Sequence, residues 1–352
     1  MKLLIDLQHP ADFHFFRPLV TRLQREGHQV RMTGRDKDIL VQLAAEYGME
    51  VEIFGRARKG VWNLGRELIY RQWRLLGIVR DFRPDLMMSL GGTYVSLVGR
   101  LLGVPTYVFY DTEHATLSNL LSYPFASCVY APRCYRKPIR WRHQRYNGYH
   151  ELAYLHPRYF TPDTTVLDEV GLKEGEVFSV VRFVAWGAAH DFGLSGFTYE
   201  GKLRAINELS RFGPVFISAE GPLPEELEKF RYPLKLSRIH HLMAFASLIF
   251  GESATMASEG AVLGVPGVYV DPVGRGYTDE QERDYGLIFN FTSDRQDEAI
   301  AKGVEILSKS SREKWKAKGQ QLVAEKIDVT EMLHGIGVKR KEYIQKSNNL
   351  MK

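Results

Sequence analysis

Cysteine is scarce in this chain, whose 352 residues include only Cys128 and Cys134. One pair cannot build a disulfide framework, and the spacing fits no common zinc motif, so we expect a reducing compartment and no metal site. Long hydrophobic runs are lacking too, since no stretch approaches the roughly 20 apolar residues of a membrane-spanning helix. The apolar start, MKLLIDL, ends at Asp6 without the length or cleavage site of a signal peptide. These absences favour a cytoplasmic protein.

Charge of one sign is not in large excess either. The chain has 47 Lys and Arg against 42 Asp and Glu, a net charge of +5 and a pI near 9.0. This mildly basic balance fits an anionic ligand or surface but does not require nucleic acid, and we expect no nucleic-acid partner. A hydrophobic share of 44% is ordinary for a globular protein. The length exceeds one ordinary domain, so we expect two.

Strand-like and helix-like segments alternate from the first residue onward. Continuous apolar runs such as residues 2–7 are typical of strands covered on both faces. Alternation of this kind predicts an α/β fold with parallel, doubly wound sheets. In the first half, the expected strands are 2–7, 29–33, 50–54, 85–89, 106–110 and 127–131, and the expected helices are 13–26, 36–47, 63–82 and 94–102.

The alternation breaks between about residues 131 and 161, a stretch rich in Arg, Tyr, His and Pro, and we place a domain boundary near its end. We therefore expect one Rossmann-like domain at 1–160, joined by a C-terminal helix at 328–352, and a second at 161–327. The two are expected to face a central cleft. The expected elements of the second half are strands at 177–183, 215–219, near Leu234, at 248–250 and at 267–270, and helices at 201–212 and after 251.

The stretch GESATMASEGAVLGVPGVYVD, residues 251–271, fits a phosphate site. Ligands of open parallel sheets bind beyond the carboxyl ends of the strands. Gly251 lets a ligand approach the backbone, Ser253 and Thr255 can donate hydroxyl hydrogen bonds, and the helix that starts there offers unpaired N–H groups. Glu259, one helical turn beyond Thr255, can accept bonds from the two hydroxyls of a ribose. The alternative is a solvent-facing glutamate on an ordinary helix.

Titratable residues follow other expected strands. Asp111, Glu113 and His114 form a dense group after strand 106–110, which suits acid–base chemistry, although a helix cap is the alternative. His14, placed in the loop after the first strand, can take a proton near neutral pH or can be an ordinary buried histidine. Two glycine-containing loops are weaker candidates for substrate binding: Gly91-Gly92, which can equally be a tight turn, and the loop from Arg182 to Gly187.

Residues 56–83 combine basic side chains with tryptophan. Eight Arg and Lys face two acidic residues there, and Trp62 and Trp73 lie among leucines and Ile69. Such a helix can lie on an anionic membrane, or it can have one core face and one solvated basic face. Peripheral membrane contact is therefore one expectation for this segment, and a helix with a buried face and a solvated basic face is the other.

At these residues the chain resembles a known family. PDLMMSLGGTYVS at 84–96 with LGVP at 102–105, and GESAT at 251–255 with EGAVLGVP at 259–266, resemble the MurG-like glycosyltransferases of the GT-B fold. More closely, the whole chain is similar to an archaeal and bacterial family called DUF354. DLQHPADFHFFRP at 6–18, DTEHA at 111–115 and TMASE at 255–259 look typical of that family.

The resemblance implies a GT-B-like fold and a nucleotide-sugar donor, such as a UDP-sugar, held mainly by the second domain. Glu259 would bind the ribose, the 251–256 loop the diphosphate, and Gly187 with its neighbours an opposite phosphate. Residues 277–281, including Glu280 and Gln281, would lie against the donor sugar, and His14 falls in the loop that can carry the acceptor base. The donor is a substrate, so no cofactor is implied. The first loop departs from MurG, because Gln8 to Asp12 replaces a glycine-rich run.

Three functions remain open. The leading hypothesis is a metal-independent glycosyltransferase. His14, Glu113 or His114 would deprotonate the acceptor, and a lipid-linked molecule is among the possible acceptors. The second is a non-hydrolysing UDP-sugar 2-epimerase. That class usually has an aspartate after the glycine that ends the fourth strand, whereas this chain reads Gly91-Gly92-Thr93. The third is a non-catalytic protein that keeps the fold and a nucleotide pocket.

Overall fold

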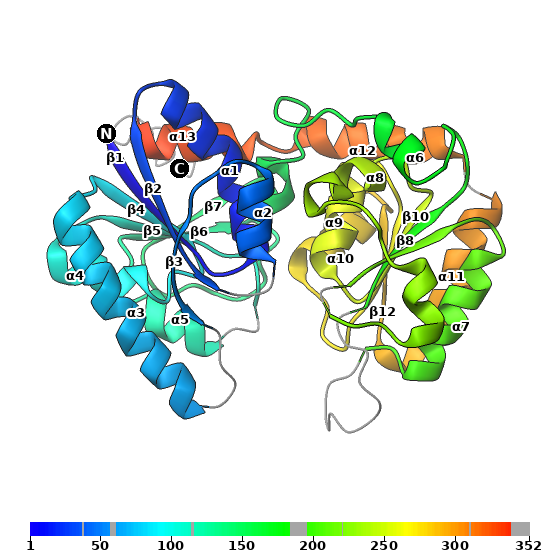
Figure 1. The fold of residues 1–352 in the computed structure, drawn as a ribbon, viewed down its shortest axis with the longest axis horizontal. Coiled ribbons are helices and arrows are strands. Elements are labelled where there is room, and N and C mark those ends of the chain that lie inside the picture. The colour runs from blue at the N-terminus through cyan, green and yellow to red at the C-terminus, as the bar shows by residue number, and fades with distance from the viewer. Residues whose placement is uncertain are drawn as a thin grey trace. The chain divides into compact units, whose positions relative to one another are not determined.

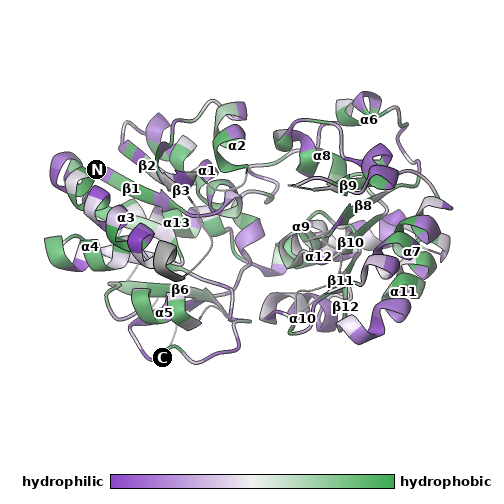
Figure 2. Cartoon of the chain, turned by 60° about the horizontal axis from the view of Figure 1, so that its bottom comes forward, coloured by the Kyte–Doolittle hydropathy of each residue, from purple (hydrophilic) through white to green (hydrophobic). Residues whose placement is uncertain are grey.

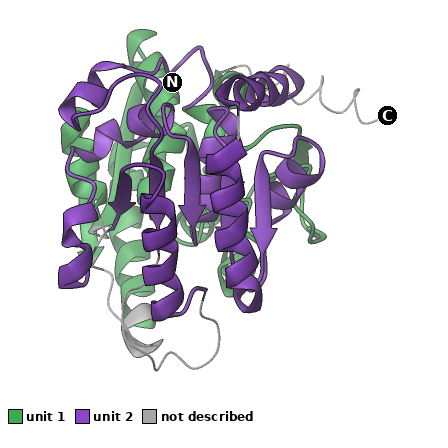
Figure 3. Cartoon of the chain, turned by 90° about the vertical axis from the view of Figure 1, so that its right-hand side faces the viewer, with its two compact units in different colours: residues 1–154, 327–352 green, residues 155–326 purple. Residues whose placement is uncertain are grey.

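The computed structural model describes residues 1–36, 39–56, 61–113, 116–183, 196–219, 221–309 and 311–338. The chain divides into two compact units, coloured separately in Figure 3. Unit 1 comprises Met1–Tyr154 and Ile327–Lys352, and unit 2 comprises Leu155–Lys326. The chain therefore passes from one unit to the other twice.

Within the described residues, unit 1 contains a sheet of seven parallel strands in the order β3-β2-β1-β4-β5-β6-β7 (Figure 1). The order reverses between β1 and β4, where Asp6 is in register with Ser89. Such a switch point is where open parallel sheets bind ligands. The strands are β1 (Lys2–Leu7), β2 (Gln29–Asp36), β3 (Glu52–Arg56), β4 (Leu86–Leu90), β5 (Thr106–Phe109), β6 (Cys128–Pro132) and β7 (His143–Tyr146). The helices are α1 (Pro10–Arg25), α2 (Leu40–Glu46), α3 (Val61–Phe82), α4 (Val95–Leu102), α5 (Thr116–Ser122), the 3-10 helix η1 (His150–Ala153) and α13 (Val329–Val338).

The described part of unit 2 contains a five-stranded parallel sheet in the order β12-β11-β10-β8-β9. Its switch point lies between β8 and β10, where Arg182 is in register with Gly251. The strands are β8 (Ser179–Arg182), β9 (Val215–Ser218), β10 (Leu248–Gly251), β11 (Gly267–Val270) and β12 (Ile288–Phe291). The helices are α6 (Thr165–Glu169), α7 (Tyr199–Ser210), η2 (Glu225–Phe230), η3 (Leu236–Arg238), α8 (Ile239–Met243), α9 (Ala254–Val262), α10 (Gly276–Arg283), η4 (Ser293–Arg295), α11 (Gln296–Lys309) and α12 (Arg312–Glu325).

The predicted α/β class with two doubly wound sheets is confirmed, with corrections in detail. The strand expected near Leu234 is absent from the described residues there, which instead form η3 at Leu236–Arg238. β7 was not predicted, because its sequence HQRY is polar and its first residue is exposed. The helix expected from Asp36 begins at Leu40, since Asp36 still belongs to β2.

The strands are buried as their apolar sequences predict. In Figure 2, β1 and β6 are coloured mostly as hydrophobic, and Leu3, Leu4 and Ile5 of β1 have no exposed surface. Among the described helices, none combines the length and the hydrophobicity that a membrane-spanning segment needs.

The C-terminal helix α13 belongs to unit 1. It buries Leu333 completely, and the Thr330 hydroxyl donates a 2.7 Å hydrogen bond to the Ala153 carbonyl. The first segment of unit 1 ends at Tyr154 rather than at the expected residue 160, just after η1, which contacts both α1 and α13. Residues 339–352 of the expected helix lie outside the described residues.

Candidate functional site

The junction between β10 and α9 in unit 2 requires a glycine. Gly251 has φ +137°, in a region that L side chains rarely adopt, and an added Cβ would lie 2.0 Å from the Arg182 carbonyl oxygen. The close approach brings the ends of β8 and β10 together, and Glu252 N–H donates a 2.8 Å hydrogen bond to the same carbonyl. The glycine at which we expect a ligand to approach the backbone has a packing role in the structure.

The first turn of α9 has the features of an anion site. Ser253 is the N-cap residue, and its hydroxyl oxygen accepts a 3.2 Å hydrogen bond from the Met256 N–H. The Ser253 O–H can still donate, and Thr255 is half-buried in the first turn. The first N–H groups of any helix have no intrahelical acceptor, and the helix dipole favours a negative charge there.

Glu259 lies one turn further along α9 and is held by a histidine that sequence reasoning missed. The carboxylate is 5% exposed, and its Oε1 lies 2.8 Å from His240 Nε2 of α8. Glu259 is therefore buried and paired, which excludes the alternative of a solvent-facing glutamate on an ordinary helix. His240 precedes His241 in a segment without a motif, so no sequence signal pointed to it.

The neighbouring side chains of unit 2 are bound to one another. Arg182 Nη1 donates a 3.2 Å hydrogen bond to the Ser218 carbonyl at the end of β9. Glu252 accepts a 2.6 Å hydrogen bond from the Phe197 N–H and lies 3.4 Å from Lys202 Nζ of α7. Lys202 was not singled out from the sequence. Gly187, expected in a phosphate loop, lies outside the described residues.

The two residues expected beside the donor sugar have protein partners. Gln281 has no exposed surface, and its Nε2 donates a 2.8 Å hydrogen bond to the Ser258 hydroxyl, which joins α10 to α9. Glu280 forms an ion pair with Lys326. Gln281 thus supports the back of the helix that carries Glu259.

Gly92 in unit 1 is required by packing. It has φ +68°, and an added Cβ would lie 2.4 Å from Val108 Cγ2 and 2.6 Å from the Ser122 hydroxyl oxygen. Gly91 also has a positive φ, and its N–H donates to the Phe109 carbonyl. The pair forms a tight turn at the carboxyl end of β4, close to the switch point of the sheet.

Asp111 forms an ion pair with His150, a residue that sequence reasoning did not single out. Asp111 follows β5, and its Oδ2 lies 3.0 Å from His150 Nδ1 of η1. Burial raises the pKa of the Asp111 carboxyl, but His150 and the Thr112 hydroxyl outweigh it and hold that pKa below its ordinary value. Burial lowers the pKa of His150, but Asp111 outweighs it and raises that pKa. The pair favours a charged imidazolium and an ionised carboxylate.

The other acid–base candidates of unit 1 have different recorded partners. Glu113 is 2% exposed, and its Oε1 accepts a 3.1 Å hydrogen bond from the Arg136 N–H. His14 is not in a loop but on α1, which begins three residues earlier than expected, with Pro10 in its first turn. Its ring stacks on Tyr154 at 5.3 Å. His114 lies outside the described residues.

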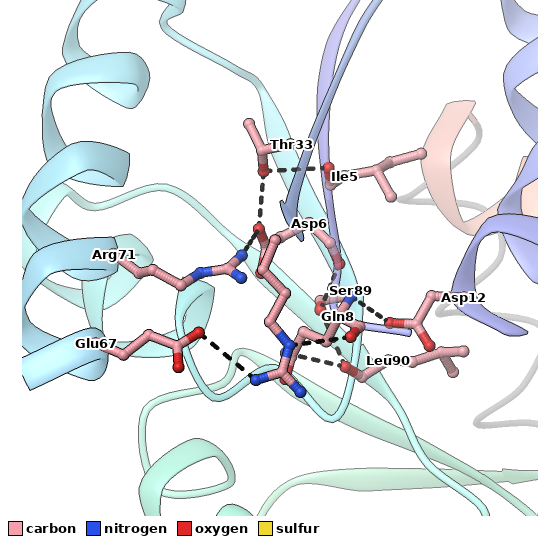
Figure 4. Close-up of polar contacts among 10 residues, drawn as sticks. Ile5, Asp6, Gln8, Asp12, Thr33, Glu67, Arg71, Ser89 and Leu90 are labelled. Atoms are coloured by element: carbon pink, nitrogen blue, oxygen red, sulfur yellow. Dashed lines mark hydrogen bonds and ion pairs between the residues drawn. The ribbon is translucent and has the colours of Figure 1, made fainter. Parts of the chain in front are cut away.

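A buried charged network lies at the carboxyl end of β1 (Figure 4). Asp6 and Arg71 of α3 both have no exposed surface and are 2.8 Å apart, and the Thr33 hydroxyl donates to the same Asp6 oxygen. Burial raises the pKa of Asp6 despite the nearby guanidinium. Glu67 of α3 pairs with Arg35 at 3.6 Å. The sequence analysis counted Arg71 among the basic residues of 56–83 that could face a membrane or solvent. Its burial shows that this was wrong for Arg71.

The opposite face of α3 is exposed and mixed in character. Ile69 is 70% and Trp73 66% exposed, with Tyr70 between them, whereas Leu75 and Val79 enter the core of unit 1. Arg66 and Arg80 are exposed on the same face at helical spacing. The side chains of Trp62 and Leu64 lie outside the described residues. Within the described ranges, no three His, Cys, Asp or Glu side chains are grouped to hold a metal ion. Cys128 and Cys134 are not joined by a disulfide.

Residues 1–185 match the family described as "Protein of unknown function (DUF354)". The chain belongs to this family. A DUF354 assignment had been predicted from three sequence motifs, and it is confirmed over just more than half of the chain.

The chain is also similar to enzymes that use nucleotide sugars. It is 31% identical over 111 residues, 29% of this chain, to the UDP-N-acetylglucosamine–N-acetylmuramyl-(pentapeptide) pyrophosphoryl-undecaprenol N-acetylglucosamine transferase of Syntrophotalea carbinolica. This DUF354 protein matches only about a third of the length of each of its two curated relatives. The match covers 31% of the transferase and 38% of the other relative, an uncharacterised protein of Methanocaldococcus jannaschii.

Two solved structures have the same fold over the whole length. UDP-GlcNAc 2-epimerase from Neisseria meningitidis, bound to UDP-GlcNAc, has a TM-score of 0.67 at 13% identity and covers 98% of this chain and 100% of its own. Glycosyltransferase VinC, in complex with dTDP, has a TM-score of 0.60 at 13% identity and covers 99% and 100%. The fold is therefore that of the GT-B glycosyltransferases and the UDP-GlcNAc 2-epimerases, as the resemblance implied.

Proposed function

We propose that this DUF354 protein is a glycosyltransferase that uses a nucleotide sugar, a UDP-sugar, as donor. The observation that carries the proposal is the β10–α9 junction. A helix N-terminus capped by Ser253 is suited to a diphosphate, and a buried, histidine-held carboxylate, Glu259, follows within two turns on the same helix. A phosphate site and a hydroxyl-binding carboxylate at this spacing fit a nucleoside diphosphate.

The proposed reaction needs a leaving group that is stabilised and an acceptor that loses a proton. The acceptor oxygen bonds to the anomeric carbon, and the bond from that carbon to the diphosphate breaks, so the nucleotide leaves with the electron pair. N–H groups at the start of α9 stabilise the charge on the diphosphate, and the proposal calls for neither a metal ion nor a cofactor. Of the candidate bases of unit 1, Asp111 is favoured, because it is ionised and partly exposed at a strand end.

Glu259→Gln tests the donor site. We expect a thermal-shift screen to find stabilisation of the wild-type protein by UDP-sugars, since a ligand that binds the folded state stabilises it by mass action. The variant should lose roughly tenfold to a hundredfold in affinity, because a hydrogen bond to a charged group contributes about 1.5–3 kcal/mol. Glu298→Gln, an exposed residue of α11, is the matched control. A wild-type protein that binds no nucleotide or nucleotide sugar would contradict the proposal.

A 2-epimerase is the second candidate. It is favoured by the fold match to UDP-GlcNAc 2-epimerase, which has a higher TM-score than the match to VinC. NMR of a UDP-sugar incubated with the protein in the absence of acceptor separates the two. Inversion at C2 of the sugar would support the epimerase and exclude transfer as the main activity.

We further propose that the protein is cytoplasmic and contacts an anionic membrane peripherally through α3. The support is the exposed stripe of Ile69, Tyr70 and Trp73 with Arg66 and Arg80 at its ends, which combines apolar insertion with charge complementarity. Trp73→Ala should abolish sedimentation with phosphatidylglycerol vesicles, and phosphatidylcholine vesicles should bind little of the wild type. Equal recovery with both vesicle types, or an unaffected variant, would contradict this contact.

A further inference from the structure

We propose that His150 is a positioning residue that fixes the Asp111 carboxylate for the acceptor hydroxyl in unit 1. The inference rests on the proposed transferase function and adds a residue that no sequence motif marks. His150 acts through Asp111 and does not itself contact the acceptor.

The first step of the argument is geometric. Asp111 stands just beyond β5, at the edge of the sheet where ligands bind, and its carboxylate is held at both oxygens. Oδ1 accepts a 3.0 Å hydrogen bond from the Thr112 hydroxyl, and Oδ2 is 3.0 Å from His150 Nδ1. Each carboxylate oxygen has a further lone pair, so the group can still accept from a substrate hydroxyl.

The second step concerns the imidazole, which is fixed from behind. The ring of Phe15, on α1, lies 4.7 Å from that of His150, and Tyr146 of β7 stacks on it at 6.5 Å with an interplanar angle of 12°. Nε2 is buried and has no hydrogen-bond partner in the described structure. A histidine confined by two aromatic rings, with Nδ1 directed at one carboxylate, is arranged to orient that carboxylate rather than to meet solvent.

The third step is electrostatic. Burial is the larger cause of the raised pKa values of Tyr110 and Tyr146, and the negative charge of Asp111 raises both further, so both phenols stay neutral. Glu151 of η1 adds to the effect of Asp111 on His150, and Asp12 of α1 acts on Tyr110. His150 is thus the cation that offsets the burial of Asp111. Without it, burial would raise the pKa of the carboxyl and the acceptor site would lose its charge.

The signs give a pH window for the pair. The pKa of Asp111 is lowered on folding, so its contribution to stability is present above the unfolded value of about 3.9 and is lost as pH falls. The pKa of His150 is raised, so its contribution is full below the unfolded value of about 6.5 and is lost as pH rises through the folded value. The stabilising coupling between the two residues is therefore greatest between those values.

The decisive variants are His150→Gln and Asp111→Asn, with His143→Gln as control. His143 is exposed on β7, close in sequence but outside the pair. In His150→Gln we expect the acid limb of the pH–rate profile to move toward neutral pH by at least about one unit, with kcat lowered roughly tenfold to a hundredfold and donor KM unchanged. In Asp111→Asn, imidazole NMR should show the pKa of His150 falling, whereas His143→Gln should change neither measurement.

The outcomes separate this inference from the proposed function. A wild-type protein that binds no nucleotide sugar refutes the transferase, but a fall in the His150 pKa in Asp111→Asn would still establish the pair. An active His150→Gln variant whose pH profile superimposes on that of the wild type overturns the positioning role. If His150→Gln does not fold, the NMR titration decides, and an unchanged His150 pKa in Asp111→Asn overturns the inference.

Discussion

Arg71 lies in the interior of unit 1 with its guanidinium 4.1 Å from the centre of the Tyr94 ring and 2.8 Å from Asp6. A buried ion pair adds little net stability, because desolvation of both charges opposes their attraction. Loss of one partner is different, since the other charge is then buried without compensation. The pair also fixes which face of α3 turns inward, which leaves Ile69 and Trp73 outside.

Arg71→Met is expected to lower the free energy of unfolding by about 3–5 kcal/mol at pH 8. The loss should be smaller at pH 5, because burial already raises the pKa of Asp6 and the variant raises it further, so that the carboxyl becomes neutral as pH falls. Urea unfolding at the two pH values measures both effects.

The matched control is Arg74→Met. Arg74 is on the same helix but is exposed and 3.8 Å from Glu52, so its removal should cost no more than about 1 kcal/mol. Equal losses for the two variants would mean that the buried pair has no special role.

At the level of single residues, candidate site residues could be predicted where they lie in a loop that the local sequence pattern identifies. Gly251, Ser253 and Glu259 could be identified because a strand, a small-residue loop and a helix follow one another locally. His150 and His240 could not, since each acts through a partner 39 or 19 positions away in the chain and lies in no motif. Arg71 was misjudged because burial of a charge depends on its partner rather than on its neighbours in sequence.

The β10–α9 junction is the element on which the proposed donor site depends. Gly251→Ala should lower the free energy of unfolding by about 2–5 kcal/mol, the sum of a positive-φ cost and overpacking against the Arg182 carbonyl. It should also weaken nucleotide-sugar binding, because the start of α9 shifts. Chemical denaturation and isothermal calorimetry measure the two effects.

Gly103→Ala provides the comparison for that substitution. Gly103 ends α4 with φ +70°, and nothing lies within 4 Å of an added Cβ. Its loss should be about 1–2 kcal/mol, the conformational cost alone. A Gly251→Ala variant no less stable than Gly103→Ala would contradict the close approach of β8 and β10.

Elements with strong local patterns were predictable, and those defined by position in the sheet were not. β1 has a continuous apolar run and was predicted residue for residue. β7, an edge strand, needs one hydrogen-bonded neighbour and no apolar sequence, so HQRY gave no strand signal. The start of α1 was missed although Pro10 is a residue type common in the first helical turn.

For the whole molecule, the proposed functions divide between the units. Glu259→Gln in unit 2 should weaken donor binding, whereas Asp111→Asn in unit 1 should leave the donor dissociation constant within about twofold while turnover is lost, because uniform binding and transition-state interactions are separable. Equilibrium binding of a UDP-sugar and single-turnover rates check this division. Loss of donor affinity in Asp111→Asn would mean that unit 1 also binds the donor, which contradicts this division.

α13 should support unit 1 and not unit 2. Leu333→Ala removes a fully buried side chain and should cost about 2–5 kcal/mol, whereas Val338→Ala, at a position 39% exposed, should cost little. Hydrogen exchange should accelerate within residues 1–154 and remain unchanged within 155–326. Faster exchange in both ranges would contradict the assignment of α13 to unit 1.

The double passage of the chain between units has a consequence for biosynthesis. Residues 155–326 are contiguous, so every strand of unit 2 is synthesised before residues 327–352 of unit 1. Unit 1 cannot be completed before unit 2, because α13, which contacts α1 and η1, follows unit 2 in the chain. Although domains generally fold from the N-terminus first, here the domain that starts first should finish last. A released chain truncated after residue 326 is expected to carry a protease-resistant unit 2 and a protease-sensitive unit 1.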